Sequence, residues 1–66
     1  PTFSNVMSKF TVHDRVRVKS KYWPYKDIKN IPGRITEIVP TKHPLCTVQF
    51  PEFRGCYEDY ELEKVE

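Results

Sequence analysis

Residues 21–29 hold the side chains best suited to recognition chemistry. Three aromatic residues fall within four positions, and three lysines flank them: Tyr22, Trp23, Tyr25, Lys21, Lys26 and Lys29. Tyrosine and tryptophan join a large apolar ring to a polar atom, and both are enriched at protein contact surfaces. One or two of these rings must cap the core of so short a chain, with Trp23 the first candidate. As a set they exceed that need, which predicts a contact surface on this segment.

A later hairpin is expected to add two rings and a cation to this surface. Closing the fold would bring Phe53 and Tyr57 near the aromatic segment, and Arg54 lies between them in the sequence. The predicted partner-binding residues are therefore these nine: Lys21, Tyr22, Trp23, Tyr25, Lys26, Lys29, Phe53, Arg54 and Tyr57. The rings would act as apolar anchors, and the cations would steer a protein partner with an acidic surface.

The same rings fit two other ligands. In a nucleic-acid-binding barrel of the KOW or Tudor kind they would stack on bases. The phosphates would then contact four cations: Arg15, Arg17, Lys19 and Lys21. Alternatively, Tyr22, Trp23 and Tyr57 would surround a methylated lysine. Because the net charge is only +2, below what a nucleic-acid binder usually carries, a protein partner is the first interpretation.

Metal-binding and nucleophilic chemistry have little support. The only cysteines and histidines are Cys46, Cys56, His13 and His43, and their spacing matches no recognised zinc site. A nucleophilic pair of Cys46 and His43 is disfavoured, because residues three apart across Pro44 would not normally face each other. We therefore expect no metal and no cofactor.

Acid–base catalysis is equally unsupported. The carboxylates gather at residues 58–63, where nothing predicts the raised pKa that a general acid needs. Gly33 and Gly55 are the only glycines, and both are assigned to turns, which leaves no phosphate-binding loop. The sequence predicts that the protein is not an enzyme.

The two cysteines are expected to remain reduced. If a hairpin closes over residues 51–55, Phe50 faces Cys56, and Cys46 lies about 13 Å further down its strand at about 3.3 Å per residue. A disulfide requires Cα atoms within about 7 Å. Two core-facing thiols indicate an intracellular protein.

The length of 66 residues fits one domain. A domain of this size buries only about 60% of its unfolded surface, so its core must be compact. Four Phe, four Tyr and one Trp can build such a core, and no apolar stretch is long enough to span a membrane. Residues 1–9 are expected to form a flexible N-terminal tail, and residues 10–66 the folded domain.

The charges divide unevenly along the chain. Residues 1–34 carry +6 and residues 35–66 carry −4, which gives the net charge of +2. An antiparallel pairing of the first and last strands would neutralise much of this asymmetry. The residues set beside each other would be Arg15, Arg17 and Lys19 on one strand and Glu61, Glu63 and Glu66 on the other.

Alternation predicts the first strand at residues 15–19, with Val16 and Val18 inward. Before it, Phe10 and Val12 are expected to cover one end of the core, followed by a turn at His13–Asp14. Residues 20–31 have no clean period and contain Pro24, which indicates a long loop. Pro32–Gly33 fits the central positions of a type II turn.

The second strand is expected at residues 34–39. Ile35 and Ile38 lie three apart, so both can point inward only if the strand bulges near Thr36–Glu37. The third strand, at residues 45–50, alternates with three residues inward: Cys46, Val48 and Phe50. A connection at residues 51–55, a fourth strand at 56–58, a helical turn at 59–60 and a fifth strand at 62–65 complete the pattern.

Four segments resemble the strand order of SH3-like barrels: Asp14–Val18, Gly33–Ile38, His43–Phe50 and Tyr60–Val65. Within that group, Tyr22–Trp23 and the Pro-x-x-x-Val-x-Phe strand from Pro44 are similar to the small barrels of photosynthetic electron transfer. These include the small barrel protein of photosystem I and the variable chain of ferredoxin-thioredoxin reductase. His13 stands where such barrels often have glycine.

The resemblance implies a barrel without chemistry of its own, which steadies a larger complex and helps to dock an electron-transfer protein. It adds the plastid stroma to the cytoplasm as an expected location. The sequence thus predicts an all-β fold, a single five-stranded SH3-like barrel with a long aromatic loop between its first two strands. The predicted function is a non-catalytic accessory or docking subunit that binds protein, with nucleic-acid binding as the alternative.

Overall fold

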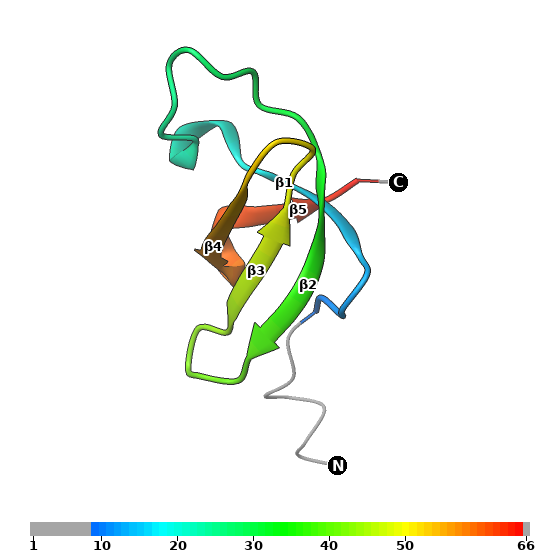
Figure 1. Ribbon diagram of the computed structural model, residues 1–66. Coiled ribbons are helices and arrows are strands. Elements are labelled where there is room, and N and C mark those ends of the chain that lie inside the picture. The colour runs from blue at the N-terminus through cyan, green and yellow to red at the C-terminus, as the bar shows by residue number, and fades with distance from the viewer. Residues whose placement is uncertain (1–8, 66) are drawn as a thin grey trace.

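The computed structural model describes residues 9–65, which form one five-stranded antiparallel sheet and contain no α-helix (Figure 1). The strands are β1 (Arg15–Val18), β2 (Gly33–Val39), β3 (Leu45–Gln49), β4 (Arg54–Glu58) and β5 (Leu62–Lys64). Two short 3₁₀ turns, η1 (Ser20–Tyr22) and η2 (Asp59–Glu61), precede the second and fifth strands. The strand order is β4-β3-β2-β1-β5, which confirms the all-β prediction. Apart from Lys9, the predicted N-terminal tail lies outside the described residues.

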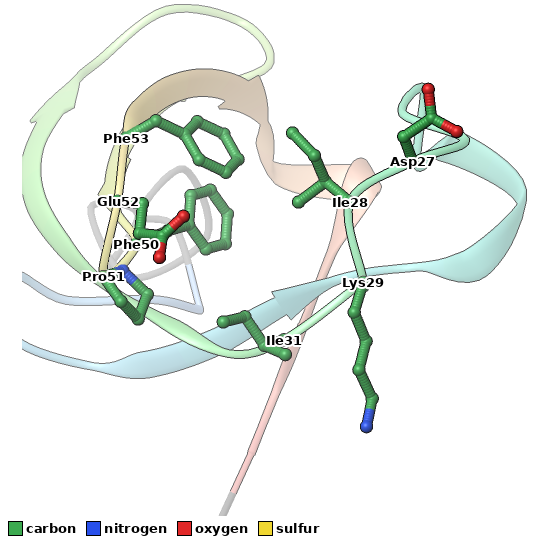
Figure 2. A pocket seen from close by; sticks show the side chains of 8 residues that line it. All are labelled: Asp27, Ile28, Lys29, Ile31, Phe50, Pro51, Glu52 and Phe53. Atoms are coloured by element: carbon green, nitrogen blue, oxygen red, sulfur yellow. The ribbon is translucent and has the colours of Figure 1, made fainter.

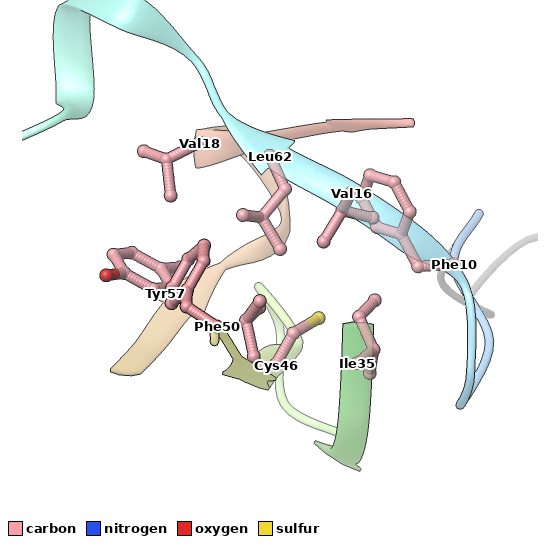
Figure 3. Packing of buried hydrophobic residues seen from close by; sticks show 9 residues of the cluster. Phe10, Val16, Val18, Ile35, Cys46, Phe50, Tyr57 and Leu62 are labelled. Carbon is pink, nitrogen blue, oxygen red and sulfur yellow. The ribbon is translucent and has the colours of Figure 1, made fainter. Parts of the chain in front are cut away.

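Apolar side chains from every strand meet in one buried core, as Figure 3 shows. Its members are Phe10, Val16, Val18, Ile35, Cys46, Val48, Phe50, Tyr57 and Leu62. Val16 and Val18 are fully buried while Arg15 and Arg17 are exposed, so the predicted alternation of the first strand is confirmed. The inward set predicted for the third strand is confirmed as well.

The segment before β1 follows the prediction only in part. Phe10 is buried, but Val12 is 41% exposed, so its predicted role as a core cap is wrong. Asp14 N–H donates to the Thr11 carbonyl at 3.1 Å, which closes a tight turn over residues 11–14. Val12 occupies the tip of this turn, and His13 has a φ of 82°. The turn at His13–Asp14 is therefore present, and its geometry directs Val12 into solvent.

The start of β2 differs from the prediction. Gly33 does not sit in a type II turn, since no glycine of the described residues has a positive φ. It is the first residue of β2 and is buried. A Cβ on Gly33 would lie 2.7 Å from both the Gln49 carbonyl oxygen and Val48 Cγ1. Close packing against β3, and not turn geometry, requires glycine here.

The predicted bulge in the second strand is confirmed. The register between β2 and β3 shifts between Ile35 and Glu37. Ile35 is fully buried, and Ile38 packs against the core from a partly buried position. The extra residue turns both isoleucines inward, as their spacing required.

The first and last strands meet as predicted. Val18 pairs with Leu62, and the Arg17 guanidinium lies 3.3 Å from a Glu63 carboxylate oxygen. Lys64 makes a further ion pair with Asp14 at 3.6 Å. Glu66, another expected partner, lies outside the described part of the chain. Half-exposed pairs of this kind contribute little stability but favour one strand partner and register.

The β3–β4 hairpin is tighter than predicted. Gln49 pairs with Arg54, so the connection is residues 50–53 and not 51–55. Cys46 lies opposite Tyr57, and Cys56 lies opposite Thr47. Cys46 is buried and Cys56 is exposed, so the prediction of two core-facing thiols is wrong for Cys56. Both thiols are free because neighbouring ladder positions point to opposite faces of the sheet.

Candidate protein-binding site

A pocket lies between the segment that leads into β2 and the turn that joins β3 to β4. Its volume is about 310 Å³. The lining residues are Asp27, Ile28, Lys29, Ile31, Phe50, Pro51, Glu52 and Phe53. Figure 2 shows the rings of Phe50 and Phe53 on one side and the side chains of Ile28 and Ile31 on the other. This region, called the loop pocket below, is mainly apolar.

A cluster of rings joins the loop pocket to the core. Phe50 and Phe53 stack with their centroids 4.7 Å apart, and Trp23 packs edge-on against Phe50 at 5.8 Å. Tyr25 packs edge-on against both Trp23, at 5.1 Å, and Phe53, at 5.4 Å. The rings fill one another's faces, so they do not form an open cage for a methylated lysine.

One hydrogen bond ties the loop to this ring cluster. Trp23 Nε1–H donates to the Ile28 carbonyl at 2.8 Å. Trp23 itself is partly buried and packs against the core. It therefore caps the core and also positions one wall of the loop pocket.

The opposite wall is held by side chains of the hairpin. Gln49 Nε2 donates to the carbonyls of Phe50, at 2.7 Å, and Phe53, at 3.0 Å. Arg54 Nε in turn donates to Gln49 Oε1 at 3.2 Å. The Phe50 N–H also bonds the Phe53 carbonyl at 2.8 Å. These bonds fix the turn, with Pro51 and Glu52 exposed at its tip.

Three of the nine predicted contact residues, Trp23, Tyr25 and Phe53, come together at the loop pocket. Lys29 lines it, but Figure 2 shows its side chain extending away from the opening. Lys26 is exposed and is not part of the lining.

Tyr57 is not a surface residue as predicted. Its side chain is only 7% exposed and belongs to the core. Its ring packs edge-on against Phe50 at 6.1 Å. Burial raises the pKa of Tyr57 to about 12, and the nearby Tyr25 adds to the effect. Tyr57 cannot anchor a partner without leaving the core.

Tyr22 and Lys21 belong to a second group of side chains around η1 and η2. The Tyr22 ring packs edge-on against Tyr60 at 5.6 Å, and Lys21 Nζ lies 5.1 Å from the Tyr22 centroid. His43 packs on Tyr60 from another side at 5.4 Å. Tyr60 Oη donates to Glu58 Oε1 at 2.6 Å, and this bond raises the pKa of Tyr60 to about 12.

Sequence reasoning missed most of the loop-pocket lining. Ile28 and Ile31 are apolar residues three apart in a loop, and that spacing was the available signal. Phe50 and Pro51 were assigned to the core and to the connection. Asp27 and Glu52 place two carboxylates at a site for which only cations were predicted.

The remaining reactive groups form no catalytic or metal-binding constellation in residues 9–65. Burial raises the pKa of the Cys46 thiol, with a smaller effect from Asp59, so the reactive thiolate is disfavoured. No group of three or more metal-ligating side chains gathers among the residues that the structure describes. Those residues also include no helix with the length and hydropathy needed to cross a membrane.

Comparison with known proteins finds no match among protein families, curated proteins or solved structures. The function must therefore be argued from the geometry of the chain itself.

Proposed function

We propose that this chain is a non-catalytic protein-binding module, an SH3-like barrel that acts as a small accessory or docking subunit of a larger complex. The loop pocket is its binding site. The observation that carries the proposal is an apolar pocket with Ile28, 44% exposed, on its wall and a core-anchored ring cluster behind it. The strand order, with η2 between β4 and β5, supports the barrel interpretation.

The size of the loop pocket suits side chains of a peptide segment. A volume of about 310 Å³ is at the lower end of the range of about 300–1,000 Å³ for small-molecule sites. One or two apolar side chains would fill it. Both walls are already fixed, one by the Trp23–Ile28 bond and the other by the Gln49 bonds. Binding would therefore cost little ordering of the site.

Charge favours a protein partner over nucleic acid. The lining contains two carboxylates, Asp27 and Glu52, and one ammonium group, Lys29. Of the cations elsewhere, Arg17 and Lys64 are paired with Glu63 and Asp14. A phosphate backbone needs unpaired cations in a row. Apolar contact, rather than steering by a net positive surface, would carry the affinity.

Ile28 and Val39 provide a matched pair of variants to test the site. Both are β-branched and similarly exposed, at 44% and 41%, but only Ile28 lines the loop pocket. Random peptides displayed on phage would be selected on the purified chain and synthesised. We expect Ile28→Glu to weaken their binding by about tenfold or more, as for the loss of a central anchor, and Val39→Glu to leave it unchanged. Amide NMR shifts should map to residues 27–31 and 50–53.

Two results would refute this proposal. One is equal binding of the selected peptides to the wild type and to Ile28→Glu. The other is failure to select any peptide together with binding of single-stranded RNA that falls steeply with salt, which would favour the nucleic-acid alternative.

A further inference from the structure

The outer edge of β4 is unpaired. β4 ends the strand order, with β3 as its only neighbour in the described sheet, and Figure 1 shows it beside β3 at that end. An exposed edge strand presents backbone donors and acceptors that can pair with another chain. The question is which chain β4 fits.

The hairpin register identifies the backbone groups that point outward. Phe50 N–H bonds the Phe53 carbonyl at one end of the hairpin, and Asp59 N–H bonds the Pro44 carbonyl at the other. Since ladder bonds recur at every second residue, odd-numbered residues of β4 bond to β3. Arg54, Cys56 and Glu58 therefore direct their N–H and C=O groups to the free edge.

Most of these groups remain available. Glu58 N–H is taken by Glu61 Oε1 at 2.9 Å. Both groups of Arg54, both of Cys56 and the Glu58 carbonyl point away from β3. The side chains of Arg54 and Cys56 are exposed, and that of Glu58 is half-buried. All three stand on the outer face of the sheet.

We propose that β4 pairs with β4 of a second copy of this chain. The two strands run antiparallel around a two-fold axis at Cys56, so each Arg54 lies opposite the second copy's Glu58. The two sheets then continue into each other through β4. Four backbone hydrogen bonds form: two between the Cys56 residues, and one from each Arg54 N–H to the facing Glu58 carbonyl.

Charge selects both the partner and the register. Centring on Cys56 places two opposite charges across the interface on the outer face, a stabilising arrangement. An antiparallel register centred on Arg54 or on Glu58 would bring like charges together, and so would parallel pairing. The Glu58 carboxylate is held in place by Tyr60 Oη at 2.6 Å. A carboxylate has about four acceptor sites, so it can also accept from arginine.

The interface is small, so the dimer should be weak. Two five-residue edges bury less than the roughly 1,200 Å² that stable complexes need, and association is expected in the high micromolar to millimolar range. This inference is independent of the proposed function, because no residue of the loop pocket takes part.

Reversal of the two charges tests the register. Sedimentation equilibrium over a concentration series should give a monomer–dimer equilibrium for the wild type. Arg54→Glu and Glu58→Arg should each weaken association by about tenfold, since like charges then face each other. The double variant R54E/E58R restores both pairs at unchanged net charge, so it should dimerise like the wild type. Lys42→Glu, the same charge change on an exposed loop, should have no effect.

A second variant covers the case in which Glu58→Arg unfolds the chain by disturbing η2. Cys56→Pro removes an outward N–H and leaves the bonds to β3 intact, as edge positions allow. It should abolish dimerisation while the β-sheet circular dichroism is retained. A wild type that stays monomeric at all concentrations would overturn the proposal. So would a dimer that survives both Arg54→Glu and Cys56→Pro.

Discussion

The ring of Tyr57 lies over the backbone of Gly55 on the inner face of β4. A Cβ on Gly55 would be 2.6 Å from Tyr57 Oη and 2.8 Å from Cε2. Tyr57 is 7% exposed and packs against Phe50, so its ring cannot move into solvent. Glycine at position 55 is therefore required by the residue two positions later. The turn to which the sequence pattern assigned Gly55 is not there.

Gly55→Ala should destabilise the protein by about 1–3 kcal/mol, because the added methyl group overpacks the core. Urea denaturation followed by Trp23 fluorescence would measure the change. Cys56→Ala, at the exposed neighbouring position, is the control and should leave the midpoint nearly unchanged. The overlap would also predict that Gly55→Ala costs much less when Tyr57 is replaced by Leu. Equal costs in both backgrounds would show that the ring is not the obstacle.

Two tyrosine hydroxyls should respond in opposite ways to removal. Tyr57 Oη is buried and has no hydrogen-bond partner among the described residues, whereas Tyr60 Oη donates to Glu58. Because an unsatisfied buried hydroxyl is costly, Tyr57→Phe should leave stability unchanged or raise it by up to about 1 kcal/mol. Tyr60→Phe should lower it. A marked loss of stability in Tyr57→Phe would reveal a partner for that hydroxyl.

Stability should fall at alkaline pH. The pKa of Tyr57 is raised from 10.0 to about 12, chiefly by burial. Between these values the unfolded chain releases the proton while the folded chain keeps it, so rising pH favours unfolding. Urea midpoints measured from pH 10 to pH 12 should decline, and Tyr57→Phe should flatten the decline. An identical slope in the two proteins would contradict the assignment.

The strands that could be predicted carry their own evidence. Val16 and Val18 alternate with arginines, and that pattern fixes both the strand and its inward face. The three-residue spacing of Ile35 and Ile38 implied the bulge, because a flat strand cannot bury both. In each case a local pattern was sufficient, since the period of two belongs to the strand itself.

The hairpin register and the loop pocket could not be predicted in this way. The connection at residues 50–53 is fixed by backbone bonds and by the Gln49 side chain, which leave no periodic signal. A shift of one residue in a strand reverses every side chain. For that reason Cys56 was wrongly assigned to the core and Tyr57 to the surface. The pocket depends on how residues 27–31 meet residues 50–53, a tertiary contact.

His13→Gly should stabilise the protein. His13 has a φ of 82°, a region that costs an L-residue roughly 1–2 kcal/mol. Its side chain is exposed, and its backbone bonds to Ile35 and Arg34 would persist in the variant. Part of the gain is offset by the greater freedom of glycine in the unfolded chain, so a net gain of about 0.5 kcal/mol is expected. Val12→Gly, at a residue without positive φ, should instead be destabilising, and thermal unfolding would compare the two.

Trp23→Phe should loosen the loop pocket while keeping the ring contact with Phe50. The variant loses the Nε1 hydrogen bond to the Ile28 carbonyl, whose net contribution is about 1 kcal/mol. Amide exchange should therefore quicken at residues 26–30 and stay unchanged in β3. Tyr25→Phe retains its ring packing against Trp23 and Phe53, so it should leave exchange in this segment unaltered. If Trp23→Phe exchanged like the wild type, the wall at Ile28 would be held by packing alone. Peptides selected on the loop pocket should then bind both proteins equally.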